Sequence, residues 1–240
     1  MTTASGMRAF SPAAGVQNVP DMAFRDRADA GRRLATSLSH LAGAADVVVL
    51  GLARGGVPVA YEVATALGAP LDVLLARKLG VPGQPELAMG ALASGGLRVL
   101  NRSVIDSLRI PADAVEQVAE REAAELARRE ELYRPGRPQL DVGGKVAVVV
   151  DDGLATGATM RAAIAALRAQ SPARLIAAVP VGSAETCADV AREADELVCL
   201  RTPASFHAVG QWYDDFTQVT DDEIRALLAA PTGKEDEHGQ

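Results

Sequence analysis

Two adjacent carboxylates, followed by a loop of small residues, stand out near residue 150. Residues 146–150 are apolar and mostly valine, which is typical of a strand buried on both faces. Asp151 and Asp152 come next, and a Thr-Gly-x-Thr loop then leads into an alanine-rich stretch that predicts a helix. Hydroxyls, small residues and a helix N-terminus form a cradle for a phosphate dianion. Because carboxylates would repel that phosphate, they suit the hydroxyls of an attached sugar or a cation, and the stretch predicts a sugar-phosphate site.

This stretch resembles the phosphoribosyl pyrophosphate (PRPP) signature of the type I phosphoribosyltransferases, most closely the adenine-type version with Ala-Thr-Gly. The resemblance implies that Asp151 and Asp152 hold the ribose 2′- and 3′-hydroxyls and act in catalysis, while the loop wraps the 5′-phosphate. The implied PRPP-binding residues are Asp151, Asp152, Gly153, Leu154, Ala155, Thr156, Gly157, Ala158 and Thr159. An ordinary strand–turn–helix that binds nothing is the alternative.

A second glycine loop follows the strand expected over 46–50. Arg54 carries a forked cation, and Gly55 and Gly56 allow a ligand to approach the backbone closely. In open α/β sheets, ligands bind outside the carboxyl ends of the strands. The segment resembles the pyrophosphate loop of the same family, which implies a pyrophosphate site at Arg54, Gly55 and Gly56. A simple turn is the alternative.

Two adjacent cations, Arg77 and Lys78, enter a segment rich in glycine and proline. Adenine phosphoribosyltransferases have a similar Arg-Lys pair before a Pro-Gly loop. This resemblance adds both residues to the pyrophosphate site, with Lys78 as a catalytic cation, and implies a flexible lid over 78–97; a solvated loop is the alternative. The family's glutamate near the base corresponds to Ala88 here. Glu86, which an extended segment would project from the same face, is the candidate for that catalytic role.

Aromatic residues make up only 3% of the chain, yet several gather between 206 and 216. They suit the wall of a flat heterocycle, and a small core beneath a loop is the alternative. The segment resembles the hood of hypoxanthine–guanine phosphoribosyltransferases. This implies base contacts from Phe206, Trp212 and Tyr213, and a magnesium site at Asp214 and Asp152. The aspartate that those enzymes carry just before Thr-Gly is Ala155 here, so that proton handler is absent.

Composition and charge limit the class of protein. The 240 residues, 48% of them hydrophobic, can form one domain with a sizeable core. A net charge of −7 without a basic block argues against a nucleic-acid partner. No apolar run has membrane-spanning length and no secretion signal is visible, so a cytoplasmic location is expected. The cysteines, Cys187 and Cys199, follow no metal-ligand pattern and suit core packing.

Alternating helix and strand patterns predict a parallel sheet covered on both sides. Helices are expected over 26–41, 57–67, 111–133, 160–167 and 184–192, strands over 46–50, 71–76, 146–150, 174–181 and 196–200, and a hairpin over 87–100. The charged helix at 111–133 suggests a solvated face with i,i+4 ion pairs, and an oligomer contact is the alternative. One domain is expected over 22–230, with its hood mainly over 201–220 and disordered tails over 1–21 and 231–240.

The family resemblance implies a fold and an activity. The fold is the α/β type I phosphoribosyltransferase fold: an open parallel sheet of about five strands, helices on both faces and a small hood from both chain ends. The activity is transfer of phosphoribosyl from PRPP to a nitrogen heterocycle, with a purine-like base expected, pyrophosphate released, Mg²⁺ as cofactor and a role in nucleotide salvage. A homodimer without nucleic-acid or membrane partners is expected. A non-catalytic PRPP-binding regulator is the alternative, because Ala88 and Ala155 replace proton handlers.

Overall fold

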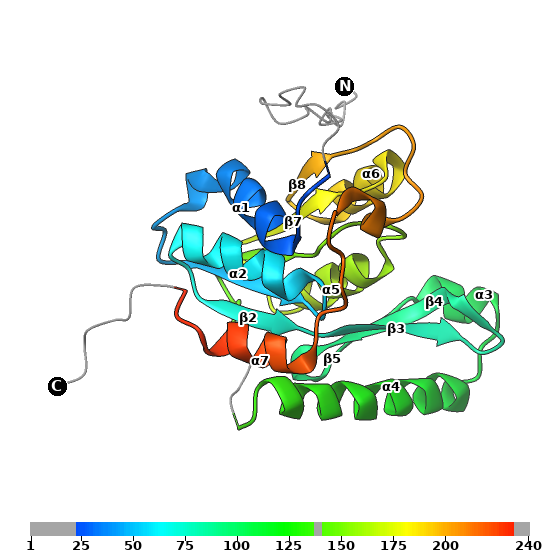
Figure 1. Cartoon of the computed structure of the whole chain (residues 1–240). Coiled ribbons are helices and arrows are strands. Elements are labelled where there is room, and N and C mark those ends of the chain that lie inside the picture. The colour runs from blue at the N-terminus through cyan, green and yellow to red at the C-terminus, as the bar shows by residue number, and fades with distance from the viewer. Residues whose placement is uncertain (1–22, 137–140, 233–240) are drawn as a thin grey trace, which may run out of the picture.

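A five-stranded parallel sheet forms the centre of the protein (Figure 1). The computed structural model describes residues 23–136 and 141–232, so the tail predicted over 1–21 and most of that over 231–240 lie outside the described residues. In sheet order the strands are β2 (Leu71–Leu74), β1 (Val47–Leu52), β6 (Val146–Val150), β7 (Arg174–Val181) and β8 (Glu196–Arg201).

Helices cover both faces of this sheet. The described helices are α1 (Arg27–Ser37), α2 (Gly56–Leu67), α3 (Arg102–Ser107), α4 (Ala112–Tyr133), α5 (Ala158–Arg168), α6 (Ala184–Glu193) and α7 (Asp221–Ala229), of which α3 and α4 pack on a second sheet. Val47 and Val49 of β1 pack with α1 and α2, whereas Val48 and Leu50 pack on the other face with α5 and α6. Since both faces are buried, the central strands β1 and β6 are apolar throughout. The predicted fold class is confirmed.

A second, antiparallel sheet extends from the parallel one. Its strands are β3 (Ala76–Val81), β4 (Gln84–Ala93) and β5 (Leu97–Leu100), in that order. Ala93 packs towards α5, while Leu79 and Leu92 pack with Val118 of α4, so the two helices lie on opposite faces of this sheet (Figure 1). The predicted hairpin over 87–100 is confirmed by the pairing of β4 with β5 around a turn at Ser94–Gly96.

One sequence expectation changes in this region. The segment 78–97, expected as a lid with loop character, consists mainly of strands, because its apolar side chains pack on α4 and α5; its mobility stays a prediction. The charged helix α4 has one buried side, where Val115, Val118 and Leu126 pack against the antiparallel sheet. Its outer face does carry the expected ion pairs, such as Glu125 with Arg129.

The segment around Phe24, near the start of the described chain, meets residues 212–215 at the carboxyl end of the parallel sheet. The Phe24 amide donates to the Trp212 carbonyl and the Asp214 amide donates to the Phe24 carbonyl, both at 2.8 Å. Phe24 and Tyr213 are buried together with Val181 in a small core of their own. This core forms the hood. None of the helices in the described residues is long and apolar enough to cross a membrane.

Candidate active site

The two predicted ligand loops meet at one edge of the parallel sheet. β1 and β6 are neighbours, with Gly51 opposite Val150, so the loops that follow them emerge side by side. A Cβ atom on Gly55 would lie 1.9 Å from the Asp152 Oδ2 atom, and one on Gly56 would lie 2.4 Å from the Val150 carbonyl oxygen. Only glycine fits at these positions. The structure therefore brings the Arg54–Gly56 loop against the acidic pair.

The acidic pair is an electrostatically costly arrangement. The Asp152 amide donates to Asp151 Oδ1 at 2.9 Å, which fixes the first carboxylate over the backbone. Burial, and secondly the neighbouring charge of Asp152, raise the pKa of Asp151 well above its usual value. Carboxylates held so close together, at a strand end, favour a role in binding over a role in packing.

Arg27 is a site residue that sequence reasoning missed. Its Nε donates to Asp152 Oδ2 at 2.9 Å, and the two side chains are only 11% and 15% exposed. Its Nη1 donates to the Thr217 carbonyl, and its guanidinium carbon lies 4.0 Å from the Phe216 ring centroid. Burial still raises the pKa of Asp152, although Arg27 opposes that shift. No local pattern marks Arg27, because its partner lies on a distant loop.

The phosphate loop ends at the N-terminus of α5. Gly157 is the N-cap and has a φ of 69°, which favours glycine. The Thr186 hydroxyl on α6 donates to the Ala155 carbonyl at 2.8 Å and so supports the loop from behind. The hydroxyl residues Thr156 and Thr159 are exposed. The Ala158 amide donates to the Thr156 hydroxyl at 3.4 Å, so amides and hydroxyls gather at this helix N-terminus, an arrangement that suits a phosphate.

The aromatic residues of the hood differ in their exposure. Tyr213 is 6% exposed, its ring packs 5.4 Å from that of Phe24, and its hydroxyl donates to the Asp152 carbonyl at 2.6 Å. It therefore supports the sugar loop from the hood core, which differs from the base-facing position that the sequence predicted. Phe206 and Trp212 are half-buried at the edge of this core, and Asp214 is exposed.

A cavity of about 790 Å³ is lined by some of the predicted site residues but not by others. Thr156, Ala158 and Thr159 line one side of it, and Arg77 and Lys78 of β3 line another. Arg54, Gly55, Gly56 and the acidic pair do not belong to its lining. The side chain of Glu86, on β4, lies outside the described residues.

The acidic groups of the site bear on whether it could hold magnesium. Within the described residues, no group of three His, Cys, Asp or Glu side chains could hold an ion. Magnesium binds proteins through one or two carboxylates and otherwise keeps waters and substrate phosphate oxygens as ligands. Asp152 and Asp214 stay the predicted carboxylates for that limited contribution; the Tyr213 hydroxyl donates to the main-chain carbonyl of Asp152, and Asp214 follows Tyr213 in the chain.

The fold and the paired loops define a phosphoribosyltransferase-type protein. The family model described as phosphoribosyl transferase domain matches residues 23–215, and the chain belongs to that family. Members of this family act as transferases that use PRPP, which agrees with the resemblance found in the sequence.

Individual relatives agree with this assignment. A protein of Mycobacterium tuberculosis strain H37Rv named "Putative phosphoribosyl transferase Rv0571c" is 54% identical over 205 residues, which are 85% of this chain and 46% of the relative. The chain thus spans about half the length of the curated relatives it matches. The crystal structure of TT1426 from Thermus thermophilus has 45% identity and a TM-score of 0.81, covering 88% of this chain and 100% of that one.

Proposed function

We propose that this chain transfers a phosphoribosyl group from PRPP to a nitrogen heterocycle and releases pyrophosphate. The observation that carries the proposal is the close approach of Gly55 to Asp152, which brings together the segments proposed for pyrophosphate and for ribose. In this arrangement Asp151 and Asp152 accept hydrogen bonds from the ribose hydroxyls, and the Thr156–Thr159 loop holds the 5′-phosphate. Arg54 with its two glycines holds the leaving pyrophosphate.

The chemistry explains why these groups are needed together. Departure of pyrophosphate leaves a sugar with oxocarbenium character, as in glycoside cleavage. Mg²⁺, when bound, neutralises charge on the leaving group. Fixing both ends of the sugar phosphate supplies much of the rate by positioning, and the carboxylates lie where positive charge develops. Lys78 and Glu86 remain candidates for adding charge and handling the acceptor proton.

The acceptor is proposed to be a purine-like base in contact with Phe206 and Trp212 at the edge of the hood. These two rings are half-buried, so each retains exposed surface for stacking. The homodimer, the cytoplasmic location and the absence of nucleic-acid and membrane partners stay predictions.

A PRPP-binding regulator is the second candidate. One observation favours it: Ala88 and Ala155 stand where adenine and hypoxanthine–guanine phosphoribosyltransferases, respectively, carry proton handlers. The Arg27–Asp152 pair does not distinguish the two functions, because both require Asp152 to accept a ribose hydroxyl.

One assay separates the two functions. Pyrophosphate release is measured with PRPP, Mg²⁺ and a panel of purines and pyrimidines, beside the Asp151→Asn/Asp152→Asn variant as control. Turnover with any base that the control lacks supports the transferase. PRPP binding by calorimetry without release for any base supports the regulator, and absence of PRPP binding contradicts both.

A further inference from the structure

The cavity beside the phosphate loop has a wall that the proposed function does not use. One side is the phosphate loop, with Thr156 and Thr159, and the floor is β3, an edge strand of the antiparallel sheet. The opposite wall is the helix α4, which contributes Gln117, Arg121 and Glu122. A phosphate held by the loop would therefore lie across the cavity from α4.

The charge of this cavity is opposite to that of the chain. Arg77, Lys78 and Arg121 line it, against the single carboxylate of Glu122, whereas the whole chain carries −7. The lining thus has two more cations than anions, which matches the two negative charges of a phosphate monoester. Concentrated positive charge in a hollow attracts and orients anions.

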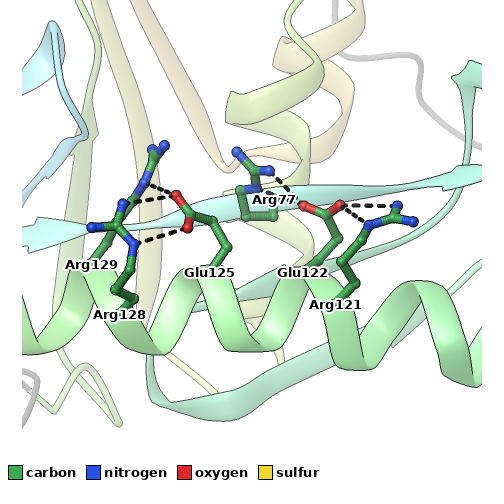
Figure 2. A network of polar contacts seen from close by, with 6 residues as sticks. All are labelled: Arg77, Arg121, Glu122, Glu125, Arg128 and Arg129. Carbon is green, nitrogen blue, oxygen red and sulfur yellow. Dashed lines mark hydrogen bonds and ion pairs between the residues drawn. The ribbon is translucent and has the colours of Figure 1, made fainter.

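Glu122 fixes two of these cations at the cavity (Figure 2). Its Oε2 accepts from the Arg77 Nε at 2.8 Å, and its Oε1 accepts from the Arg121 Nη2 at 3.2 Å. Glu122 is 14% exposed. Burial raises its pKa, but the bonds and charge of Arg77 and then Arg121 outweigh this, so the pKa is lowered and the carboxylate stays ionised.

The same helix carries a matching arrangement that lies away from the cavity. Glu125 pairs with Arg128 and Arg129 just as Glu122 pairs with two arginines, and Figure 2 shows the two clusters in succession along α4. None of these three residues lines the cavity. Their arginines both come from α4 itself, whereas Arg77 reaches Glu122 from β3. Of the two clusters, only that of Arg77, Arg121 and Glu122 links β3 to α4 across the cavity lining.

We propose that α4 completes the phosphate site, with Arg77 and Arg121 binding the 5′-phosphate of the sugar substrate opposite Thr156 and Thr159. This inference rests on the proposed function, because it takes the loop to be a ribose 5-phosphate cradle. It moves Arg77 from the pyrophosphate end, where the sequence placed it, to the 5′-phosphate end. Glu122 competes with the phosphate for both guanidinium groups. Forked guanidinium donors suit a phosphate group.

Calorimetric titrations with two separate ligands test the inference at low ionic strength. Ribose 5-phosphate carries the 5′-phosphate alone, and inorganic pyrophosphate with Mg²⁺ probes the other end. Arg77→Gln should weaken ribose 5-phosphate binding about tenfold and Arg121→Gln about threefold, since the Arg121 side chain is 70% exposed. Glu122→Gln should strengthen it about threefold by removing a competing charge. Pyrophosphate affinity should change less than ribose 5-phosphate affinity in all three.

Arg128→Gln and Glu125→Gln are the matched controls and should leave both affinities unchanged. Opposite shifts for Arg121→Gln and Glu122→Gln cannot come from partial unfolding, which would lower affinity in both. The inference is overturned if the cavity variants behave like the controls, if Glu122→Gln weakens ribose 5-phosphate binding, or if pyrophosphate binding alone responds. Failure of the unaltered protein to bind ribose 5-phosphate and PRPP would instead reject the proposed function on which the inference rests.

Discussion

The sugar end and the phosphate end of the proposed site handle charge in contrasting ways. At the sugar end, Asp151 and Asp152 are desolvated, Arg27 already pairs with the carboxylate of Asp152, and the Tyr213 hydroxyl donates to the main-chain carbonyl of Asp152. At the phosphate end, the threonine hydroxyls are exposed and cations line an open cavity. Burying charge destabilises the empty protein, whereas exposed cations cost little. Substitutions at the sugar end should therefore change stability and binding together, and those at the phosphate end mainly binding.

The largest effect is expected from Asp151→Asn combined with Asp152→Asn. Each charged acceptor of a ribose hydroxyl contributes about 1.5–3 kcal/mol, so PRPP affinity should fall by about a hundredfold or more. Circular dichroism should show an intact fold. Calorimetry with PRPP measures the loss, and an unchanged dissociation constant would remove the acidic pair from the ligand site.

Removing the cation at the sugar end should cost stability. Arg27→Met leaves Asp152 without its partner, and the free energy of unfolding should fall by about 2–3 kcal/mol, below the value for a fully buried pair because both side chains retain some exposure. Denaturant titration measures the fall.

A second substitution isolates the ion pair itself. Adding Asp152→Asn to Arg27→Met should recover much of the loss, since no unpaired charge remains. Arg25→Met is the control, because Arg25 is 70% exposed and its partner Asp29 keeps a second cation, Arg33. An equal fall in the free energy of unfolding for Arg25→Met would show that the Arg27–Asp152 pair stabilises the fold no more than an exposed pair does.

The pH dependence of stability gives a third test. Burial and the Asp152 charge raise the pKa of Asp151, so the folded state holds this proton more tightly than the unfolded chain. The contribution of this group to the free energy of unfolding therefore falls as the pH rises from its unfolded pKa, about 3.9, towards the folded pKa.

Asp151→Asn removes that penalty and keeps the Oδ1 acceptor for the Asp152 amide. The free energy of unfolding at neutral pH should rise by about 0.5–2 kcal/mol, and the gain should shrink as the pH is lowered from the raised folded pKa towards about 4. Urea titrations across this range measure it. If the gain in the free energy of unfolding did not depend on pH, its cause would be packing and not the charge of Asp151.

At the phosphate end, Thr156→Val should act on binding alone. It removes one exposed hydroxyl at nearly constant volume, so ribose 5-phosphate affinity should fall by a factor of about five, the equivalent of about 1 kcal/mol. The melting temperature of the empty protein should stay the same. Loss of pyrophosphate affinity without loss of ribose 5-phosphate affinity would place the loop at the other end of the substrate.

Local patterns predicted the sheet and the loops. Helices bury both faces of β1 and β6, so every position of these strands is apolar. Such a continuous apolar run can be recognised in the sequence alone. The Thr-Gly-x-Thr loop and the Arg54 loop are contiguous segments, so each could be found without knowing the fold. The short helices α3 and α7 were missed, although Asn101 and Thr220 cap them.

Contacts between distant segments could not be predicted in this way. Arg27 reaches Asp152 and Arg77 reaches Glu122 only because the folded chain brings their elements together. In the sequence, Arg27 is one of several arginines at a helix start, and Glu122 is one of many charges on α4. A charged helix has the same composition whether it faces water or a cavity. The wall of the phosphate cavity thus became visible only in three dimensions.

The fit of Gly55 against Asp152 limits how this chain can vary. A side chain at position 55 would begin 1.9 Å from one carboxylate oxygen of Asp152, so it must displace the carboxylate. In a saturation library selected for folded protein and not for activity, nearly every substitution at 55 should be depleted in the parental background and be recovered where position 152 is also small. The two positions are far apart in the sequence, yet they should behave in genetic selection as one epistatic pair.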